Sequence, residues 1–233
     1  MTPAISIIIP AYNEEKYIRK TLHSLQQQTF QNIEIIIVAN GCTDQTENII
    51  QKRINPAEQK IHLYTLPKAQ VSKARNFGAQ QAKSEILVFL DADTQLPPDA
   101  LQKINQQFTS KYAIATTRIL PDNPTFKYRT LLAIKNFYLQ TGLYKSCSGV
   151  LICHRDQFLK MQGYDEKLQV REHHKLILTL LKQAQYSCIN TYATTSMRRF
   201  DQWGFNKIFW FWVRKWFQEK WGTLINSKYE KVR

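Results

Sequence analysis

Four short apolar runs in the first half of the chain each end in a polar loop and are followed by a segment with helical spacing. The runs are Ile5–Ile9, Ile33–Val38, Ile61–Leu66 and Ile86–Leu90. Runs of this length that are almost continuously apolar predict strands buried on both faces. Strands of this kind that alternate with helices are typical of an α/β fold, with a mostly parallel central sheet flanked by helices.

The segments between and after these strands show apolar residues at helical spacing or helix-capping residues. Five helices are expected. The first contains Ile18, Leu22 and Leu25, and the second is capped by Thr43 or Asp44 and runs through Asn55. The third covers Val71–Ala82, the fourth lies within Pro124–Lys145, and the fifth covers Glu172–Gln183. A Ser/Gly segment lies at Ser146–Gly149, and no repeat or linker is visible before about Arg199. We therefore expect one catalytic-size domain over residues 1–200 and an extension over residues 201–233.

Polar residues follow three of the predicted strands directly. Pro10 to Glu14 follow the first strand, Asn40 to Asp44 follow the second, and Asp91 and Asp93 follow the fourth. Ligands of open parallel sheets bind beyond the carboxyl ends of the strands. These loops are therefore expected to meet at one edge of the sheet.

Asp91 and Asp93 place two carboxylates at the end of a buried strand. Like charges at such a position need a cation, and hard oxygen ligands suit Mg²⁺ or Mn²⁺. Either ion can bridge the two phosphates of a nucleoside diphosphate and stabilise it as a leaving group. Taken alone the motif is weak, because surface turns and helix caps use the same residues.

The formal net charge of +14 implies an anionic partner, such as nucleic acid, an anionic bilayer or a phosphorylated substrate. Helix-turn-helix, zinc-finger and RNP-like patterns are absent from the sequence, so nucleic acid is not the expected partner. The first strand is not followed by Gly-x-Gly-x-x-Gly, which disfavours a dinucleotide-dependent oxidoreductase. The four cysteines form no CxxC pair and are expected to be reduced cytosolic thiols.

The order and spacing of several motifs resemble those of family 2 glycosyltransferases. The motifs are Ile7-Ile-Ile-Pro-Ala-Tyr-Asn-Glu-Glu15, Asn40-Gly-Cys-Thr-Asp44, Lys73-Ala-Arg-Asn76, Asp91-Ala-Asp93 and a Gly163-Tyr-Asp-Glu166 turn. The resemblance covers roughly residues 4 to 200. It implies a GT-A fold and an inverting transferase that takes a sugar from a nucleotide sugar with the help of Mg²⁺ or Mn²⁺.

By this resemblance, Pro10, Tyr12 and Glu14 line the nucleotide pocket, with Tyr12 near the base and Glu14 near the base or ribose. A packing role for Tyr12 at the entry to a helix remains an alternative. Asn40 stands where the family usually has an Asp that reads the base edge. An amide offers one acceptor and two donors, which suits uracil, so a UDP-sugar is favoured over a GDP-sugar.

The resemblance also assigns residues to the diphosphate and the metal. Arg75 would contact the diphosphate, although a solvated position on a helix face is an alternative. Asp91 would contact the nucleoside and Asp93 the metal, and both are candidate metal ligands. Arg198 or Arg199, in a Ser-x-Arg-Arg segment, would close over the diphosphate once the donor binds.

The catalytic base is expected at Glu172 or His173, where inverting members of the family usually have a Glu-Asp pair. An acceptor that is itself a phosphate, as in polyprenyl-phosphate glycosylation, would need no base. The expected acceptor is a lipid-linked or cell-envelope glycan. The absence of a Gln-x-x-Arg-Trp motif favours single-residue transfer. A noncatalytic, membrane-associated relative that only binds nucleotide sugar is the alternative function.

Aromatic and basic residues alternate from Phe205 onward. Phe205, Ile208, Phe209, Trp212 and Trp216 recur at helical spacing, which predicts an amphipathic helix that lies on an anionic membrane surface. Packing of this helix on the domain or on a second subunit is the alternative. Apolar runs are far shorter than the ~20 residues that span a bilayer. We therefore expect a cytoplasmic protein bound peripherally to the inner face of the cell membrane, with its oligomeric state open.

Overall fold

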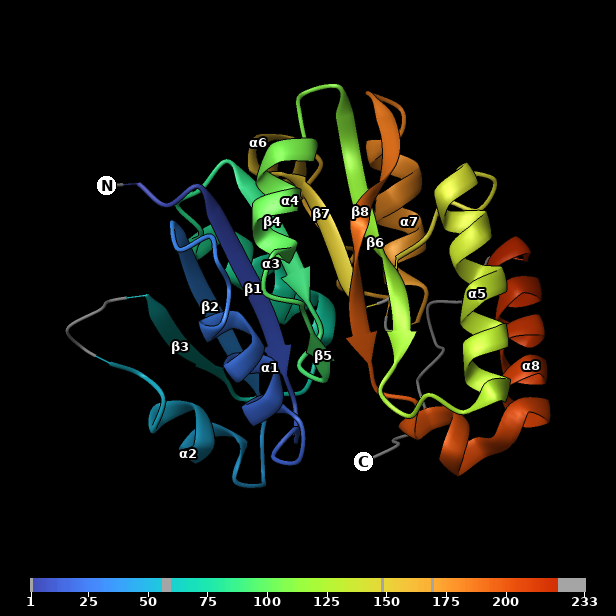
Figure 1. The fold of residues 1–233 in the computed structure, drawn as a ribbon, viewed down its shortest axis with the longest axis horizontal. Coiled ribbons are helices and arrows are strands. Elements are labelled where there is room, and N and C mark those ends of the chain that lie inside the picture. The colour runs from blue at the N-terminus through green and yellow to red at the C-terminus, as the bar shows by residue number, and fades with distance from the viewer. Residues whose placement is uncertain (1, 56–59, 148, 169, 222–233) are drawn as a thin grey trace.

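The computed structural model describes residues 2–55, 60–147, 149–168 and 170–221. Its strands form one sheet in the order β3-β2-β1-β4-β7-β6-β8-β5 (Figure 1). The strands are β1 Ile5–Ala11, β2 Ile33–Asn40, β3 Ile61–Leu66, β4 Ile86–Leu90, β5 Thr94–Gln95, β6 Tyr112–Pro121, β7 Val150–His154 and β8 Gln185–Thr195. The helices are α1 Ile18–Gln26, α2 Thr46–Gln51, α3 Val71–Gln81, α4 Ala100–Gln107, α5 Phe126–Thr141, α6 Arg155–Lys160, α7 Glu172–Leu180 and α8 Arg198–Lys220.

The predicted α/β class and the four predicted strands are confirmed. These strands, β1 to β4, lie side by side and run parallel, with Ile7 of β1 opposite Ile35 of β2 and Val88 of β4. Beyond β4 the sheet becomes mixed, because β7 is antiparallel to both β4 and β6, and β5 is antiparallel to β8. The carboxyl ends of β1, β2 and β4 therefore share one edge, as expected.

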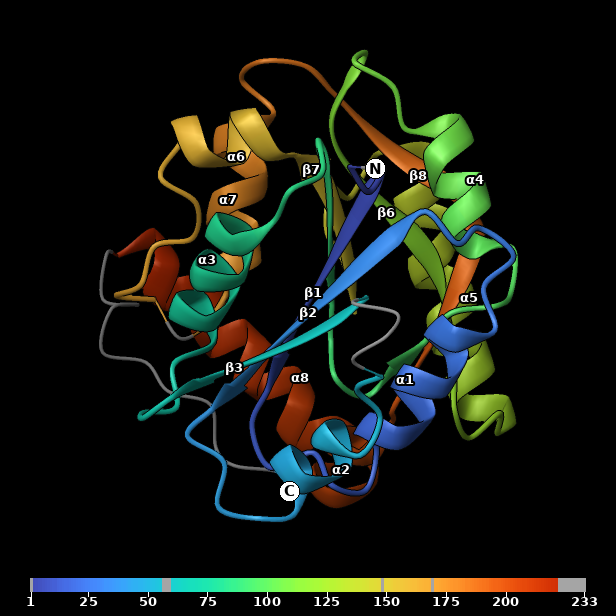
Figure 2. The ribbon, with the colours of Figure 1, turned by 90° about the vertical axis from the view of Figure 1, so that its left-hand side faces the viewer.

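Helices cover both faces of the sheet (Figure 2). On one face, Ile7 and Val88 pack in a core with residues of α1 and α4, including Leu22. On the other face, Ile8 and Phe89 pack with residues of α3, α6 and α7. Because side chains of a strand alternate between faces, only continuously apolar strands can supply both cores.

The helix predicted to be capped by Thr43 or Asp44 and to run through Asn55 is shorter than expected, since α2 covers only Thr46–Gln51. Asp44 Oδ1 accepts a hydrogen bond from the backbone N of Thr46 at 3.0 Å. The residues before α2 also bind the loop after β1: the backbone N of Thr43 donates to Asn13 Oδ1 at 2.8 Å. After Gln51 the chain tightens into turns with three-residue hydrogen bonds, and the backbone N of Arg53 donates to the Ile50 carbonyl. α7 similarly ends at Leu180, before the predicted Gln183.

A third apolar cluster joins β6 and α5 to the beginning of α8. Its buried residues are Ile119, Tyr128, Leu132, Leu139 and Met197, with Phe200 and Phe205 packed against it. α8 begins before the expected boundary at residue 201 and kinks at Gly204, whose φ is 71°. The beginning of α8 packs on the beginning of α5, where the Tyr128 ring stacks on Phe205 and the Tyr128 hydroxyl donates to Asp201.

The C-terminal aromatic stripe forms a helix but does not face one way. Ile208 is 5% exposed, whereas its neighbour Phe209 is 61% exposed. α8 therefore packs one set of apolar residues inward and presents another set outward. The side chain of Trp216 and residues 222–233 lie outside the described part of the chain. None of the helices among the described residues has the length and apolar character needed to cross a membrane.

Candidate active site

The loops after β1 and β2 are tied together by hydrogen bonds. The backbone N of Glu14 donates to Thr46 Oγ1 at 2.7 Å, and the backbone N of Glu15 donates to Asp44 Oδ2 at 3.2 Å. The Asn13 side chain also joins the two loops, because its Nδ2 donates to Thr43 Oγ1 and its Oδ1 accepts a hydrogen bond from the backbone N of Thr43. Sequence spacing placed these loops at one edge of the sheet, and their mutual contacts now fix the position of Glu14.

Arg75 of α3 is the centre of a buried ion-pair network. Its Nη2 lies 2.9 Å from Asp91 Oδ1, and its Nη1 lies 2.9 Å from Glu172 Oε1. The Arg75 side chain is only 4% exposed, so the alternative of a solvated arginine on a helix face is wrong. The network joins α3, the end of β4 and the beginning of α7.

The charges of this network support one another. Burial disfavours ionisation of Asp91, but the Arg75 guanidinium outweighs it and holds the pKa of Asp91 below its ordinary value. Burial alone would lower the pKa of Arg75, yet the neighbouring carboxylates raise it. Both groups therefore remain charged.

Tyr164 and Asn76 support Arg75, and sequence analysis did not identify this role. The Tyr164 ring lies beneath the Arg75 guanidinium, 5.3 Å from centroid to Cζ. The Asn76 side chain accepts a hydrogen bond from the backbone N of Tyr164 and donates to its carbonyl. Gly163 has a φ of +66°, and a Cβ there would lie 2.5 Å from Asn76 Oδ1, so this close turn requires glycine. The motif that contains Asn76 and the turn that begins at Gly163 were both identified in the sequence, but the contact between them was not.

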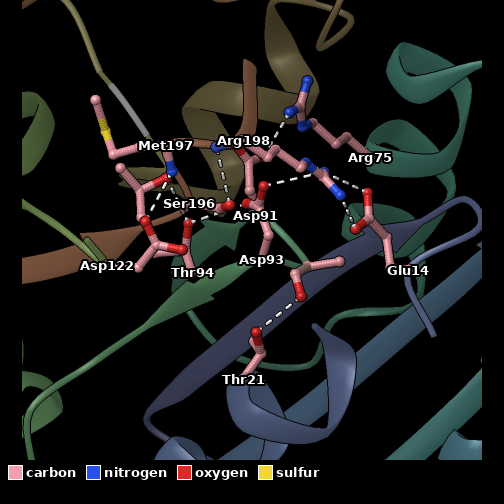
Figure 3. A network of polar contacts seen from close by, with 12 residues as sticks. Glu14, Thr21, Arg75, Asp91, Asp93, Thr94, Asp122, Ser196, Met197 and Arg198 are labelled. Atoms are coloured by element: carbon pink, nitrogen blue, oxygen red, sulfur yellow. Dashed lines mark hydrogen bonds and ion pairs between the residues drawn. The ribbon is translucent and has the colours of Figure 1, made fainter. Parts of the chain in front are cut away.

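Glu14, Asp93 and Arg198 form the second charged group at this edge (Figure 3). The two Nη atoms of Arg198 lie 2.7 and 2.8 Å from the Glu14 carboxylate, and Nη2 lies 3.0 Å from Asp93 Oδ2. Burial raises the pKa of Asp93 to about 7, Arg198 opposes this rise, and the Asp91 and Glu14 carboxylates add to it. The Arg198 guanidinium therefore compensates part of the negative charge of Glu14 and Asp93.

The carboxylates of Asp91 and Asp93 can bind a divalent cation only if other ligands complete the coordination shell of the cation. Among the described residues no cluster of three or more His, Cys, Asp or Glu side chains has metal-binding geometry. Asp91 is already bound to Arg75, which leaves Asp93 as the carboxylate whose charge is least compensated. This donor set suits a hard cation that is held jointly with the oxygens of a diphosphate.

The two candidate bases lie together at the beginning of α7. The Glu172 side chain is 7% exposed and bound to Arg75. His173 Nδ1 lies 3.0 Å from the Tyr164 hydroxyl, and burial lowers the pKa of His173 to about 4, with a further contribution from the Arg75 charge. Both side chains face the Asp91 and Asp93 site across one cavity.

The other predicted nucleotide-binding residues, Pro10, Tyr12 and Asn40, lie at the ends of β1 and β2. Pro10 is in β1 opposite Val38, Tyr12 directly follows β1, and Asn40 ends β2. Asn40 is buried, and its Oδ1 accepts a hydrogen bond from the backbone N of Gln70 at 2.9 Å. That contact orients the Asn40 amide group. These residues are outside the Arg75 and Arg198 networks.

Arg199 lines the cavity beside Asp91, and its guanidinium lies 5.7 Å from the centre of the Trp203 ring. The cavity has a volume of about 640 Å³ and lies between α5, the beginning of α7 and α8. Lys135 and Cys147 also line it, and neither was identified from the sequence. Ser148, in the predicted Ser/Gly segment, lies outside the described residues.

Known proteins with similar sequences are bacterial glycosyltransferases. An uncharacterized glycosyltransferase of Haemophilus influenzae is 37% identical over 102 residues, which are 43% of this chain and 40% of that protein. The poly(ribitol-phosphate) beta-N-acetylglucosaminyltransferase TarS of Staphylococcus aureus is 34% identical over 99 residues, which are 42% of this chain and 17% of that protein. The matched region thus spans less than half the length of these relatives.

Solved structures with the same fold are GT-A glycosyltransferases. The crystal structure of S. aureus TarS 1-349 in complex with UDP-GlcNAc has a TM-score of 0.63 and 20% identity, over 83% of this chain and 58% of that chain. The mannosyltransferase PcManGT of Pyrobaculum calidifontis, in complex with GDP-Man and Mn²⁺, has a TM-score of 0.68 and 16% identity, over 83% and 57% of the chains. The predicted GT-A fold is confirmed.

The sequence profile described as "Glycosyl transferase family 2" matches residues 6–169. This range includes the loops after β1 and β2, Arg75 and both Asp91 and Asp93. It covers well over half of the 233 residues, so the chain belongs to glycosyl transferase family 2.

Proposed function

We propose that this chain is an inverting glycosyltransferase that moves a single sugar from a nucleotide sugar, preferably a UDP-sugar, to a lipid-linked or cell-envelope glycan acceptor. The observation that carries the proposal is the paired arrangement at the sheet edge. Arg75 holds Asp91 and Glu172, while Arg198 holds Glu14 and Asp93. A site with this much charge in a small volume suits a ligand that carries both a diphosphate and a divalent cation.

In this proposal the nucleotide lies over the loops after β1 and β2. Pro10, Tyr12 and Glu14 line its pocket, and the Asn40 amide contacts the base edge. With Asn40 Oδ1 occupied by the Gln70 backbone, the Nδ2 donors face an acceptor such as a uracil carbonyl oxygen. TarS, which shares the fold, is described in complex with UDP-GlcNAc, whereas PcManGT is described with GDP-Man.

The diphosphate lies between Asp93 and Arg198. Asp93, with Asp91 beside it, would hold Mg²⁺ or Mn²⁺, which when bound neutralises the charge of the leaving diphosphate. Arg198 would exchange its carboxylate partners for phosphate oxygens, with Arg199 next to it. Arg75 acts mainly by holding Asp91 and Glu172 in place. Glu172 and His173 face the acceptor side, where an acceptor attacks the anomeric carbon opposite the leaving group.

The outward faces of α5 and α8 favour binding to an anionic membrane surface. Their exposed aromatic residues are Phe126, Phe137, Tyr138, Phe209, Trp210, Trp212, Phe217 and Trp221. Lysine and arginine residues lie among them along both helices. Aromatic side chains at the headgroup level and cations near anionic lipid are the two contributions that hold such a surface on a bilayer. In the cell, this surface would hold the protein on the inner face of the cell membrane.

Trp210→Ala is expected to weaken binding to phosphatidylglycerol-containing vesicles by about tenfold, because a side chain that is 67% exposed loses its burial in the bilayer. Leu178→Ala on α7 removes an apolar side chain that is 53% exposed on another helix and is the control. Vesicle cosedimentation measures both. Equal binding by the two variants and the wild type would contradict the membrane placement.

The transfer reaction is tested by incubating the full chain with Mn²⁺ and a panel of UDP- and GDP-sugars. We expect nucleotide release from a UDP-sugar, with the new glycosidic bond in the anomeric configuration opposite to that of the donor, as measured by proton NMR. A retained configuration would overturn the inverting mechanism. Nucleotide binding without any release or transfer would favour the noncatalytic alternative.

A further inference from the structure

The cavity next to Asp91 and Asp93 has a wall of apolar side chains. They come from α5 and α8 and are Leu131, Leu132, Phe205, Ile208, Phe209 and Trp212. Leu132 and Ile208 are buried at the inner end, while Phe209 and Trp212 are exposed at the outer end. The wall therefore leads from the outer, aromatic surface of α8 toward the reacting end of the site. An apolar chain would bury surface along its whole length.

The same cavity also carries positive charge. Lys135 of α5, Arg171 at the beginning of α7 and Arg199 of α8 all line it. Burial lowers the pKa of Lys135, so an anion beside it would favour its charged form. The cations and the apolar wall together match a ligand with one anionic end and one apolar end.

Each candidate base is already engaged by a neighbouring side chain through one of its atoms. Glu172 Oε1 accepts a hydrogen bond from Arg75, and His173 Nδ1 is occupied by the Tyr164 hydroxyl. A general base works best when its pKa is near the working pH, and the pKa of His173 is lowered to about 4. An acceptor whose attacking oxygen is already ionised would not need one.

We propose that this cavity binds a long-chain lipid monophosphate as the acceptor, with its phosphate at Lys135 and Arg199 and its chain along the apolar wall of α5 and α8. The inference rests on the proposed glycosyl transfer, and it puts a lipid phosphate in the place of the glycan acceptor. One ionised phosphate oxygen forms the bond to the anomeric carbon. The bond from that carbon to the β-phosphate of UDP breaks, and UDP leaves with the electron pair. The products are a glycosyl lipid phosphodiester and UDP, and no proton is transferred.

Binding of dodecyl phosphate, dodecanol and inorganic phosphate to the full chain, below the micelle concentration and followed by tryptophan fluorescence, tests the site. Dodecyl phosphate should bind at least about tenfold more tightly than either of the others. Lys135→Met should remove about tenfold of that affinity. Arg129→Met, which removes an exposed cation from the same helix outside the cavity, should not change it. Phe209→Ala, at an exposed position, should weaken dodecyl phosphate binding without affecting folding.

Equal affinity for dodecyl phosphate and dodecanol, or an unchanged affinity in Lys135→Met, would overturn the proposal. Tight binding of inorganic phosphate without a chain would overturn it in favour of a free phosphate. UDP binding with Mn²⁺ is measured on the same sample. If UDP binds but the lipid phosphate does not, the acceptor inference fails and the proposed function stands. If the lipid phosphate binds but UDP does not, the proposed function fails. If both ligands bind, a UDP-sugar with a labelled sugar is added and the mixture is extracted with organic solvent. The label should enter the organic phase when dodecyl phosphate is present and not when dodecanol replaces it.

Discussion

Arg75→Met is expected to lower the free energy of unfolding by about 3–5 kcal/mol, because it leaves the buried charges of Asp91 and Glu172 without their partner. Arg75 is 4% exposed and lies 2.9 Å from each carboxylate. Methionine approximates the length of the arginine stem, so the loss comes from the charge and its hydrogen bonds and not from a large cavity. Sugar transfer should fall together with stability, since α3, the end of β4 and α7 are no longer joined.

Urea unfolding followed by circular dichroism measures this effect. Arg53→Met is the control, because the Arg53 guanidinium donates to the exposed Gln26 side chain, so its loss should leave stability within about 0.5 kcal/mol of the wild type. A double variant, Arg75→Met with Glu172→Gln, should recover part of the loss by removing one unpaired charge. An Arg75→Met protein as stable as the wild type would contradict the role of Arg75 as the centre of the network.

Asp93→Asn is expected to lower kcat by about 10²–10³-fold while leaving the fold intact, because it removes the carboxylate that would hold the cation at the leaving diphosphate. Stability should not fall, since burial and the carboxylates of Asp91 and Glu14 already disfavour charge on Asp93. This separates Asp93 from Arg75, whose loss acts mainly on stability. Initial rates of nucleotide release at saturating Mn²⁺ measure the change.

Asp99→Asn is the matched control for Asp93, because the Asp99 side chain, just before α4, is half exposed and pairs with Lys103 of that helix. Its kcat should equal that of the wild type. If Asp93→Asn kept a Mn²⁺-dependent rate within about threefold of the wild type, Asp93 would not be the principal metal ligand.

The strands that could be predicted are those whose residues are buried on both faces. Ile7 and Ile8 of β1 enter different cores, so the run is apolar without interruption and is visible in the sequence. β6 and β8 are longer, but polar residues such as Thr116 and Asn190 interrupt their apolar runs, and these strands were not predicted. They are held by pairing with each other over most of their length, which depends on residues far apart in the chain.

The site residues could be located, but their partners could not. Asp91, Asp93 and Glu14 were predictable because they follow strands whose ends share one edge. The contact between Arg75 and Glu172 joins residues 97 positions apart, and no local spacing indicates it. Likewise, α5 carries apolar residues around most of its circumference, so the position of Lys135 inside a cavity follows only from how α5 packs against α8.

Calorimetric titration of UDP and GDP into the full chain, with and without Mn²⁺, tests the central claim most directly. The account predicts that UDP binds more tightly than GDP, that Mn²⁺ strengthens UDP binding by at least about tenfold, and that Asp93→Asn removes this increment. Absence of binding of either nucleotide, by a protein whose circular dichroism shows it to be folded, would contradict a nucleotide-sugar site at the edge formed by Glu14, Asp93 and Arg198.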